Sequence, residues 1–257
     1  YIIKFDIWVI GLLICGLGFA FFVDIQIART IFNPNDVIGS LINDYGNLPA
    51  YVIGLFGLLG YSLNETNLFK KSLAETSAII LVVGVGIMTH LSLGFDLKDT
   101  LSFSFIFAYG LWLWMKQVKR FKTKTFQKWF LFIVISFILL LIIPNLIKLF
   151  VLRFRPILFM GGCLEYSFYL KWLPFNLDEN FRSFPSFHVA MSAMMMVFVV
   201  YPMQSEKSRN LSIYRSILWI GIIAYYRMVV GAHFLSDTLV SVLIAYIVMR
   251  WVYSKNS

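Results

Sequence analysis

Most of the side chains that could do chemistry lie after residue 147, in three short polar groups between apolar stretches. The last group holds Arg227, His233 and Asp237. On a helix, His233 and Asp237 would share a face and could hydrogen-bond, because they are four residues apart. A carboxylate bound to one ring nitrogen leaves the other nitrogen unprotonated, as a nucleophile or base requires. We therefore predict a reactive His233 beside the cation Arg227; the alternative is a structural ion pair that closes a helix bundle.

The middle group is Ser183-Phe-Pro-Ser-Phe-His188. A proline and then Ser186 before a long apolar run are typical of a helix start, with Ser186 as the N-cap. The free amides and the helix dipole at such a start favour an anion, and His188 lies in the first turn. An ordinary capped helix with an interfacial histidine explains these residues equally well.

The first group ends an apolar run and contains Lys148, Arg155 and Pro156. Proline disfavours helix at the preceding residue, so we expect the helix to end near Arg153 and Arg155 to lie on the exit turn. Lys148 and Arg155 could then converge. If this helix crosses a membrane, the alternative is that both are interface cations that extend toward the lipid headgroups.

The elements that must position these groups are membrane helices. The chain has 257 residues, of which 60% are hydrophobic and only 14% are charged, more apolar surface than one soluble domain can bury. A hydrocarbon core of about 30 Å requires roughly 20 residues of helix. We predict an all-α, polytopic membrane bundle of about eight transmembrane helices, over residues 5–23, 48–63, 77–95, 101–115, 129–149, 187–201, 213–229 and 234–252.

The basic residues predict the orientation. The connection after the fourth predicted span carries six lysines and arginines between Lys116 and Lys128 and no acid, which indicates the cytoplasmic side. With eight spans, both termini are then cytoplasmic, and the three polar groups lie at the outer face. The net charge of +9 is explained by these loops and by anionic headgroups, so we expect no nucleic-acid partner.

We expect one integral-membrane domain over residues 1–257, with N-terminal spans in 1–128 and the chemistry in 129–257. The two cysteines, Cys15 and Cys163, provide neither a disulfide framework nor metal-ligand spacing. The third histidine, His90, has no polar partner in sequence, and we interpret it as an interface or core residue. The sequence defines no oligomeric state.

The three groups read Lys-x6-Arg-Pro, Pro-Ser-x-His and Arg-x5-His-x3-Asp. Together and in this order, they resemble the motifs of the type 2 phosphatidic acid phosphatase (PAP2) superfamily. The resemblance implies that His233 is the nucleophile that forms a phosphohistidine, that Asp237 orients it, and that His188 is the general acid. It also implies a phosphate clamp, made of Lys148, Arg155, Arg227 and Ser186.

The function that this resemblance implies is hydrolysis of a lipid phosphate or diphosphate at the outer face of a bacterial plasma membrane. Undecaprenyl diphosphate, phosphatidate and phosphatidylglycerophosphate are candidate substrates. No metal or other cofactor is expected, since the family needs none and the chain shows no carboxylate cluster. The alternatives are a lipid phosphotransferase with the same phosphohistidine, and a membrane protein that keeps these residues as a structural charge network.

Two positions depart from the usual family pattern. Phe187 stands where the second motif usually has glycine, and Tyr226 stands where the third usually has serine. Neither change removes a side chain with an expected chemical role. Phe187 could narrow the site, so we expect these departures to affect the range of substrates. The chain also has two predicted spans more than the usual six, placed before the first motif.

Overall fold

The computed structural model describes residues 2–93, 96–160, 171–172, 179–202 and 204–256. Cys163 and residues 94–95 of the third predicted span lie outside these residues. The long helices are α1 (Ile2–Ile31), α3 (Leu48–Asn64), α4 (Leu68–Leu93), α5 (Leu97–Gln117), α6 (Lys124–Phe150), α9 (Glu206–Val229) and α10 (Leu235–Asn256). The shorter elements are α2 (Val37–Tyr45), η1 (Lys119–Lys122), β1 (Val151–Leu152), α7 (Pro156–Met160), β2 (Lys171–Trp172), η2 (Glu179–Phe181), α8 (Phe187–Ser192) and η3 (Ala193–Val200).

The described residues are mainly helical, as predicted, and each predicted span falls on helix. The sixth span falls on α8 followed by the 3-10 helix η3. Within the described ranges, 4 segments could cross a membrane by length and composition: Trp8–Ile31, Val37–Asn64, Lys124–Phe150 and Leu235–Asn256. These segments are consistent with a membrane protein.

The chain forms two compact units, and each is assembled from separate segments. The first unit contains Tyr1–Gly46, Ile138–Ala193 and Ser216–Trp251. The second contains Asn47–Phe137, Met194–Arg215 and Val252–Ser257. Each unit takes residues from both sides of position 128, so these units do not follow the division of the sequence into N-terminal and motif-bearing spans.

In the first unit, α6 ends at Phe150, three residues before the predicted end near Arg153. The chain there becomes extended: β1 pairs with β2 in antiparallel register, with Val151 opposite Trp172. Arg153 then takes part in an isolated bridge with Arg182. The predicted helix end was wrong because these extended pairings satisfy the backbone groups of residues 151–153. Pro156 begins α7, a position that tolerates its missing N–H.

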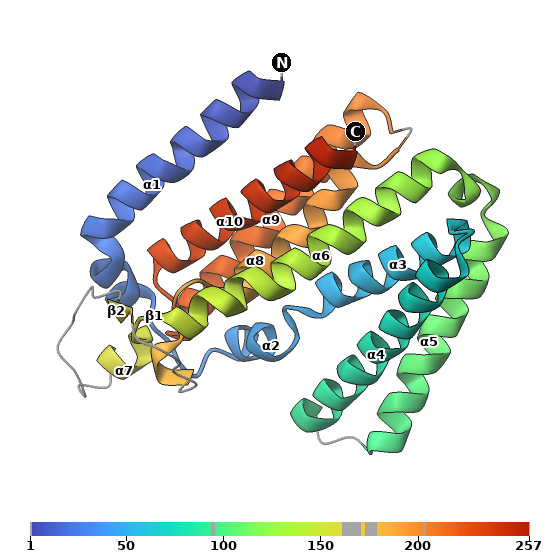
Figure 1. Ribbon diagram of the computed structural model, residues 1–257. Coiled ribbons are helices and arrows are strands. Elements are labelled where there is room, and N and C mark those ends of the chain that lie inside the picture. The colour runs from blue at the N-terminus through green and yellow to red at the C-terminus, as the bar shows by residue number, and fades with distance from the viewer. Residues whose placement is uncertain (1, 94–95, 161–170, 173–178, 203, 257) are drawn as a thin grey trace. The chain divides into compact units, whose positions relative to one another are not determined.

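In the second unit, α3, α4 and α5 follow one another side by side (Figure 1). Glycines on α3 let it approach α6 closely: a Cβ on Gly60 would lie 2.3 Å from the ring of Phe130, and one on Gly57 would lie 2.5 Å from Ile133. Aromatic rings pack around this contact, including Phe56 at 5.3 Å from Phe130 between centroids. The interior of this unit therefore depends on apolar shape complementarity.

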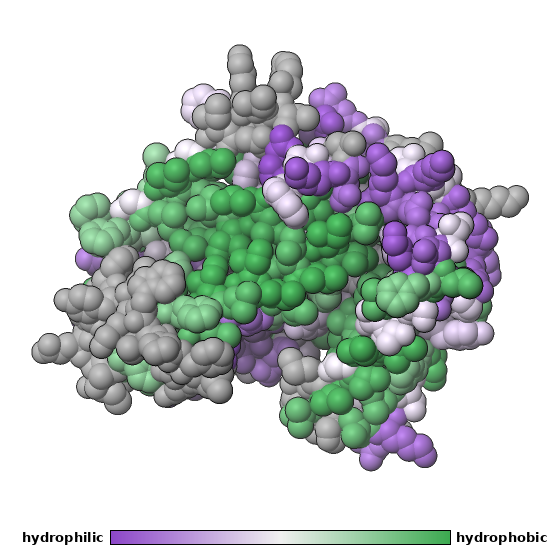
Figure 2. Space-filling model, in the orientation of Figure 1, coloured by the Kyte–Doolittle hydropathy of each residue, from purple (hydrophilic) through white to green (hydrophobic). Residues whose placement is uncertain are grey.

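Large apolar side chains cover much of the surface. Only 11% of the most apolar stretch of α1 is buried. Its exposed residues include Trp8, Leu12 and Phe22, each more than 70% exposed. The surface over α1 is broadly hydrophobic on the face shown in Figure 2. A helix with so much exposed apolar surface suits contact with lipid rather than water.

Candidate active site

The end of α9 and the turn after it position two of the predicted residues. Arg227 is buried in the last turn of α9, and its carbonyl accepts hydrogen bonds from the main-chain N–H groups of Ala232 and His233, at 3.1 and 3.3 Å. Gly231 has a φ of +69°, and a Cβ there would lie 2.6 Å from the ring of Phe32. Only glycine fits this close, left-handed position. The turn thereby returns His233 to the side of Arg227.

His233 is 1% exposed, and both of its ring nitrogens have neighbours. Its Nδ1 lies 2.5 Å from the carbonyl oxygen of Ser183. A carbonyl can only accept, so Nδ1 must carry the proton. In the neutral ring, Nε2 then has the lone pair, and it lies 3.4 Å from Nη2 of Arg227. This is the tautomer that makes Nε2 a nucleophile.

Asp237 lies beside His233 but does not hydrogen-bond to it. Its Oδ2 is 3.9 Å from Nδ1, which is too long for a hydrogen bond. The predicted pair on one helix face was wrong, because α10 begins at Leu235 and His233 precedes it in the turn. Nδ1 donates to Ser183 instead. Asp237 is therefore connected to His233 through Ser183, and the two side chains do not share a proton.

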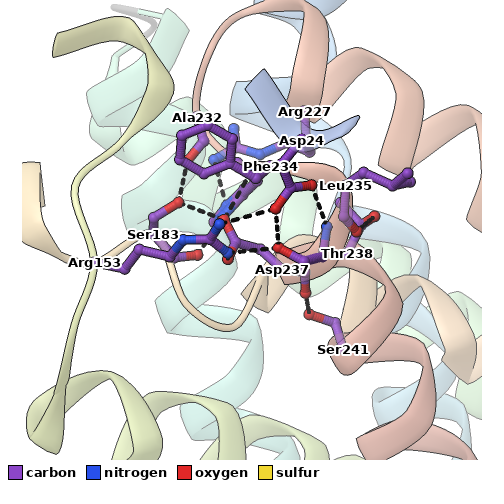
Figure 3. A network of polar contacts seen from close by, with 12 residues as sticks. Asp24, Arg153, Ser183, Arg227, Ala232, Phe234, Leu235, Asp237, Thr238 and Ser241 are labelled. Carbon is purple, nitrogen blue, oxygen red and sulfur yellow. Dashed lines mark hydrogen bonds and ion pairs between the residues drawn. The ribbon is translucent and has the colours of Figure 1, made fainter. Parts of the chain in front are cut away.

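Asp237 lies at the centre of a buried polar network (Figure 3). Its carboxylate accepts hydrogen bonds from Ser183 Oγ at 2.6 Å and from the main-chain N–H of Phe234 at 2.8 Å. Arg153 forms an ion pair with it through Nη1. The same guanidinium forms a second ion pair with Asp24 of α1, at 2.9 Å. One arginine is therefore shared between two carboxylates.

Positive charges surround His233. Burial is the largest influence on the pKa of His233 and lowers it well below the ordinary 6.5. Nearby cations lower this pKa further, in decreasing order Arg227, Lys148 and Arg155. Lys148 is buried in the last turn of α6, and Arg155 is half-buried beyond β1. His233 is therefore neutral near pH 7, next to three groups that attract phosphate.

Ser186 and His188 lie at the start of α8. Ser186 is the N-cap residue, as predicted, but its side chain makes no cap hydrogen bond. Its Oγ is fully buried and has no hydrogen-bond partner among the residues that the structure describes. His188 is half-buried, and its Nε2 lies 3.0 Å from the carbonyl oxygen of Asn43 on α2. The side-chain oxygen of Asn43 in turn accepts a hydrogen bond from Arg227.

Sequence reasoning missed four residues of this region: Asp24, Asn43, Arg153 and Ser183. Asp24 carried a usable signal, because an acidic residue within a long apolar segment requires a partner. The predicted first span ends at residue 23, just before Asp24, whereas α1 continues to Ile31. Asn43 and Ser183 carried no such signal, since their contacts come from residues far away in the sequence.

The described residues contain no group of three or more histidine, cysteine, aspartate or glutamate side chains that could hold a metal ion. Phe187 lies edge-on to His188, with ring centroids 6.2 Å apart. Tyr226 is half-buried, and its ring lies 5.1 Å from Tyr225. Of the two departures from the family pattern, Phe187 is therefore the one that contacts a site residue.

Residues 129–256 match the family model of the PAP2 superfamily. Through this domain the chain belongs to that superfamily, as its three motifs predicted. The domain extends from α6 into α10, and it indicates an enzyme of the phosphatase type. No curated protein and no solved structure matches the chain. Asp24 and Asn43 both lie outside the matched residues.

Proposed function

We propose that this chain hydrolyses a phosphate or diphosphate group of a membrane lipid, without a metal ion, through a phosphohistidine at His233. The observation that supports this most directly is the state of His233. It is buried, it is neutral, and Ser183 holds the proton on Nδ1, so that Nε2 is the nucleophile beside Arg227. Membership of the PAP2 superfamily supports the same class of reaction.

In the first step, the Nε2 lone pair of His233 forms a bond to phosphorus, and the bond from phosphorus to the lipid oxygen breaks. His188, protonated when the phosphate dianion is bound, gives its proton to the departing oxygen. The cations Lys148, Arg155 and Arg227 stabilise the charge on the equatorial oxygens, and Ser186 Oγ offers a further hydrogen bond. His233 keeps its Nδ1 proton, so the phosphorylated ring carries a positive charge.

In the second step, water attacks phosphorus and gives a proton to His188. The nitrogen–phosphorus bond breaks, and its electron pair returns to Nε2 of His233. Inorganic phosphate leaves, and both histidines return to their starting states. The covalent intermediate divides one difficult displacement into two easier ones.

We place this site at the outer face of a bacterial plasma membrane, with eight spans and both termini in the cytoplasm. The basic segment between Lys116 and Lys128 supports this orientation. In a chain with Cys15 and Cys163 replaced by serine, Asn35→Cys should react with a membrane-impermeant maleimide on intact cells. Lys122→Cys should react only after permeabilisation. The opposite pattern would reverse the orientation.

The enzymatic proposal is tested by phosphate release from purified protein. Undecaprenyl diphosphate, phosphatidate and phosphatidylglycerophosphate are presented in detergent micelles, with and without EDTA. We expect release from at least one of them, unchanged by EDTA and abolished by His233→Ala. His90→Ala on α4, outside the three motifs, is the matched control and should keep full activity.

Each alternative gives a distinct result in this experiment. Transfer of phosphate to an added alcohol, faster than release to water, would identify a phosphotransferase. Release that persists in His233→Ala would contradict the phosphohistidine, and inhibition by EDTA would contradict metal independence. No release from any substrate, by protein that binds inorganic phosphate, would favour a non-enzymatic membrane protein.

A further inference from the structure

Asp24 is a carboxylate in the interior of a long apolar helix. It lies within the 24-residue segment of α1 that could cross a membrane, and its side chain has no exposed surface. A charged group in such a position is costly unless it is paired, and it usually has a functional reason. Asp24 also lies outside residues 129–256, so the family domain does not account for it.

Every described contact of the Asp24 carboxylate is with a donor. Its Oδ1 accepts from the main-chain N–H of Ser236 at 3.0 Å. Its Oδ2 accepts from the Ser236 hydroxyl and from Arg153 Nη2, the latter at 2.9 Å. Three donors thus satisfy both oxygens of the carboxylate. Asp24 therefore fixes α1 to the first turn of α10 and to the segment after β1.

Arg153 connects Asp24 to His233 by two routes. Its side chain forms the ion pair with Asp237, which in turn accepts from the Ser183 hydroxyl. Its main chain accepts from the N–H of Ser183, at 3.1 Å. Ser183 is the residue whose carbonyl holds the proton of His233. Both routes fix the acceptor that sets the tautomer of the nucleophile (Figure 3).

The charges of this network have a direct consequence for the reaction. Two carboxylates share one guanidinium, so these three side chains together carry one net negative charge when both carboxylates are ionised. Phosphorylation makes the ring of His233 cationic, because the Nδ1 proton stays in place. The nearer carboxylate oxygen of Asp237 is 3.9 Å from that nitrogen. A net negative charge at this distance, away from water, stabilises the cationic ring.

We propose that Asp24 is a positioning residue of the active site, which acts on His233 through Arg153. It shares the Arg153 guanidinium with Asp237, so that one cation faces two carboxylates and Asp237 keeps part of the charge that stabilises the phosphohistidine. The inference rests on the proposed function, since it presumes a phosphohistidine. It also means that α1, which precedes the family domain, contributes a residue to the active site.

A purely structural role is the competing explanation, and energetics argue against it. Buried ion pairs are weak sources of stability, because the desolvation of two charges offsets most of their attraction. Replacement of a whole buried ion-pair cluster by well-packed apolar residues is often neutral or stabilising. The cluster is better explained by the charge that it provides beside the nucleophile.

The test is Asp24→Asn, which keeps the shape of the side chain and removes its charge. Steady-state kinetics with the substrate found above, and inhibition by inorganic phosphate, are measured on the full chain in detergent. We expect kcat to fall by about 10- to 100-fold, the range found when a residue that orients a metal-binding side chain is removed. The inhibition constant of phosphate should change by less than about twofold, because the clamp of Lys148, Arg155 and Arg227 is untouched.

Asp6→Asn is the matched control. It removes the same charge from the same helix, 18 positions earlier, which is about 27 Å along the axis. It should leave both constants unchanged. If Asp24→Asn does not fold, Ser236→Ala is the second variant: it removes one hydroxyl from the network and should lower kcat about 3- to 10-fold, with the phosphate constant again unchanged.

The outcomes separate the inference from the function on which it rests. An unchanged kcat in Asp24→Asn, or in Ser236→Ala if that variant is used, overturns the role of Asp24. Parallel losses of kcat and phosphate binding also overturn it, since they indicate a collapsed site. Activity that survives His233→Ala overturns the proposed function itself. Loss of activity in His233→Ala with full activity in Asp24→Asn removes only the inference.

Discussion

The interiors of the two compact units differ in the kind of side chain that they bury. Among the residues whose burial the structure describes, the buried charged side chains all belong to the first unit: Asp24, Lys148, Arg153, Arg227 and Asp237; the neutral His233 is buried in the same unit. The buried polar side chains of the second unit are hydroxyls, those of Ser62, Thr100 and Ser136. Its remaining core is built of rings and of glycines that let helices approach.

The two units therefore differ in the energetic cost of their interiors. Burying a charge costs several kcal/mol unless donors and counter-charges surround it. The first unit buries five such groups, and it also buries His233. In the part of the chain that the structure describes, the interior of the second unit is mainly apolar packing between close helices. Substitutions in the first unit should therefore change the rate, and substitutions in the second should change the stability.

The largest effect is expected for His188→Ala. Loss of the general acid should lower kcat by about 10²- to 10⁴-fold with a lipid substrate, whose departing alkoxide needs a proton. The loss should be much smaller with p-nitrophenyl phosphate, because its phenolate leaves without one. Comparing the two substrates on the same preparation is the measurement. Equal losses with both would mean that His188 binds phosphate and does not donate a proton.

The next effect concerns the geometry of a cation. Arg227→Lys keeps the charge but removes the planar fork that contacts both Asn43 and His233. We expect kcat/KM to fall by about 100-fold. Arg209→Lys, at an exposed position near the other end of α9, is the matched control and should be neutral. Full activity in Arg227→Lys would show that charge alone suffices.

The second unit gives the opposite prediction. Gly60→Ala places a Cβ against the ring of Phe130 and should destabilise the protein by roughly 1–3 kcal/mol through overpacking. Its melting temperature in detergent should fall, while kcat per folded molecule stays the same. Gly110→Ala on α5, where a Cβ meets nothing within 4 Å, is the control and should not destabilise. A fall in kcat without a fall in stability would break the contrast between the units.

The smallest effect is a shift in pH dependence. His233 must be neutral to attack, and its pKa is lowered by burial and by the cations, so its acid limb in kcat/KM should lie below pH 6.5. Lys148→Met removes one of these cations and should move that limb upward, toward 6.5. By the same linkage, the free energy of unfolding contributed by His233 should be lost as pH falls below 6.5. A limb above 6.5, unmoved by Lys148→Met, would contradict a neutral His233 near pH 7.

Much of the site could be predicted from the sequence because many of its residues lie close together along the chain. Arg227 and His233 are close because a glycine turn joins them, and Ser186 caps a helix because apolar residues follow it. The partner of His233 could not be predicted in this way. Asp237 has the right spacing for a helix face, yet the helix begins two residues after His233, and Ser183 takes its place.

The sequence alone determined the apolar helices that suit a membrane, the order of the three motifs and the side chains that we propose bind phosphate. These follow from composition and from short-range spacing, which do not depend on how distant segments meet. Only the tertiary structure decided which neighbours hold His233 in its reactive state. Asp24 and Arg153 are 129 positions apart, and Arg153 and Asp237 are 84 apart. No local pattern encodes such contacts, because they arise when separate helices bury their charges against one another.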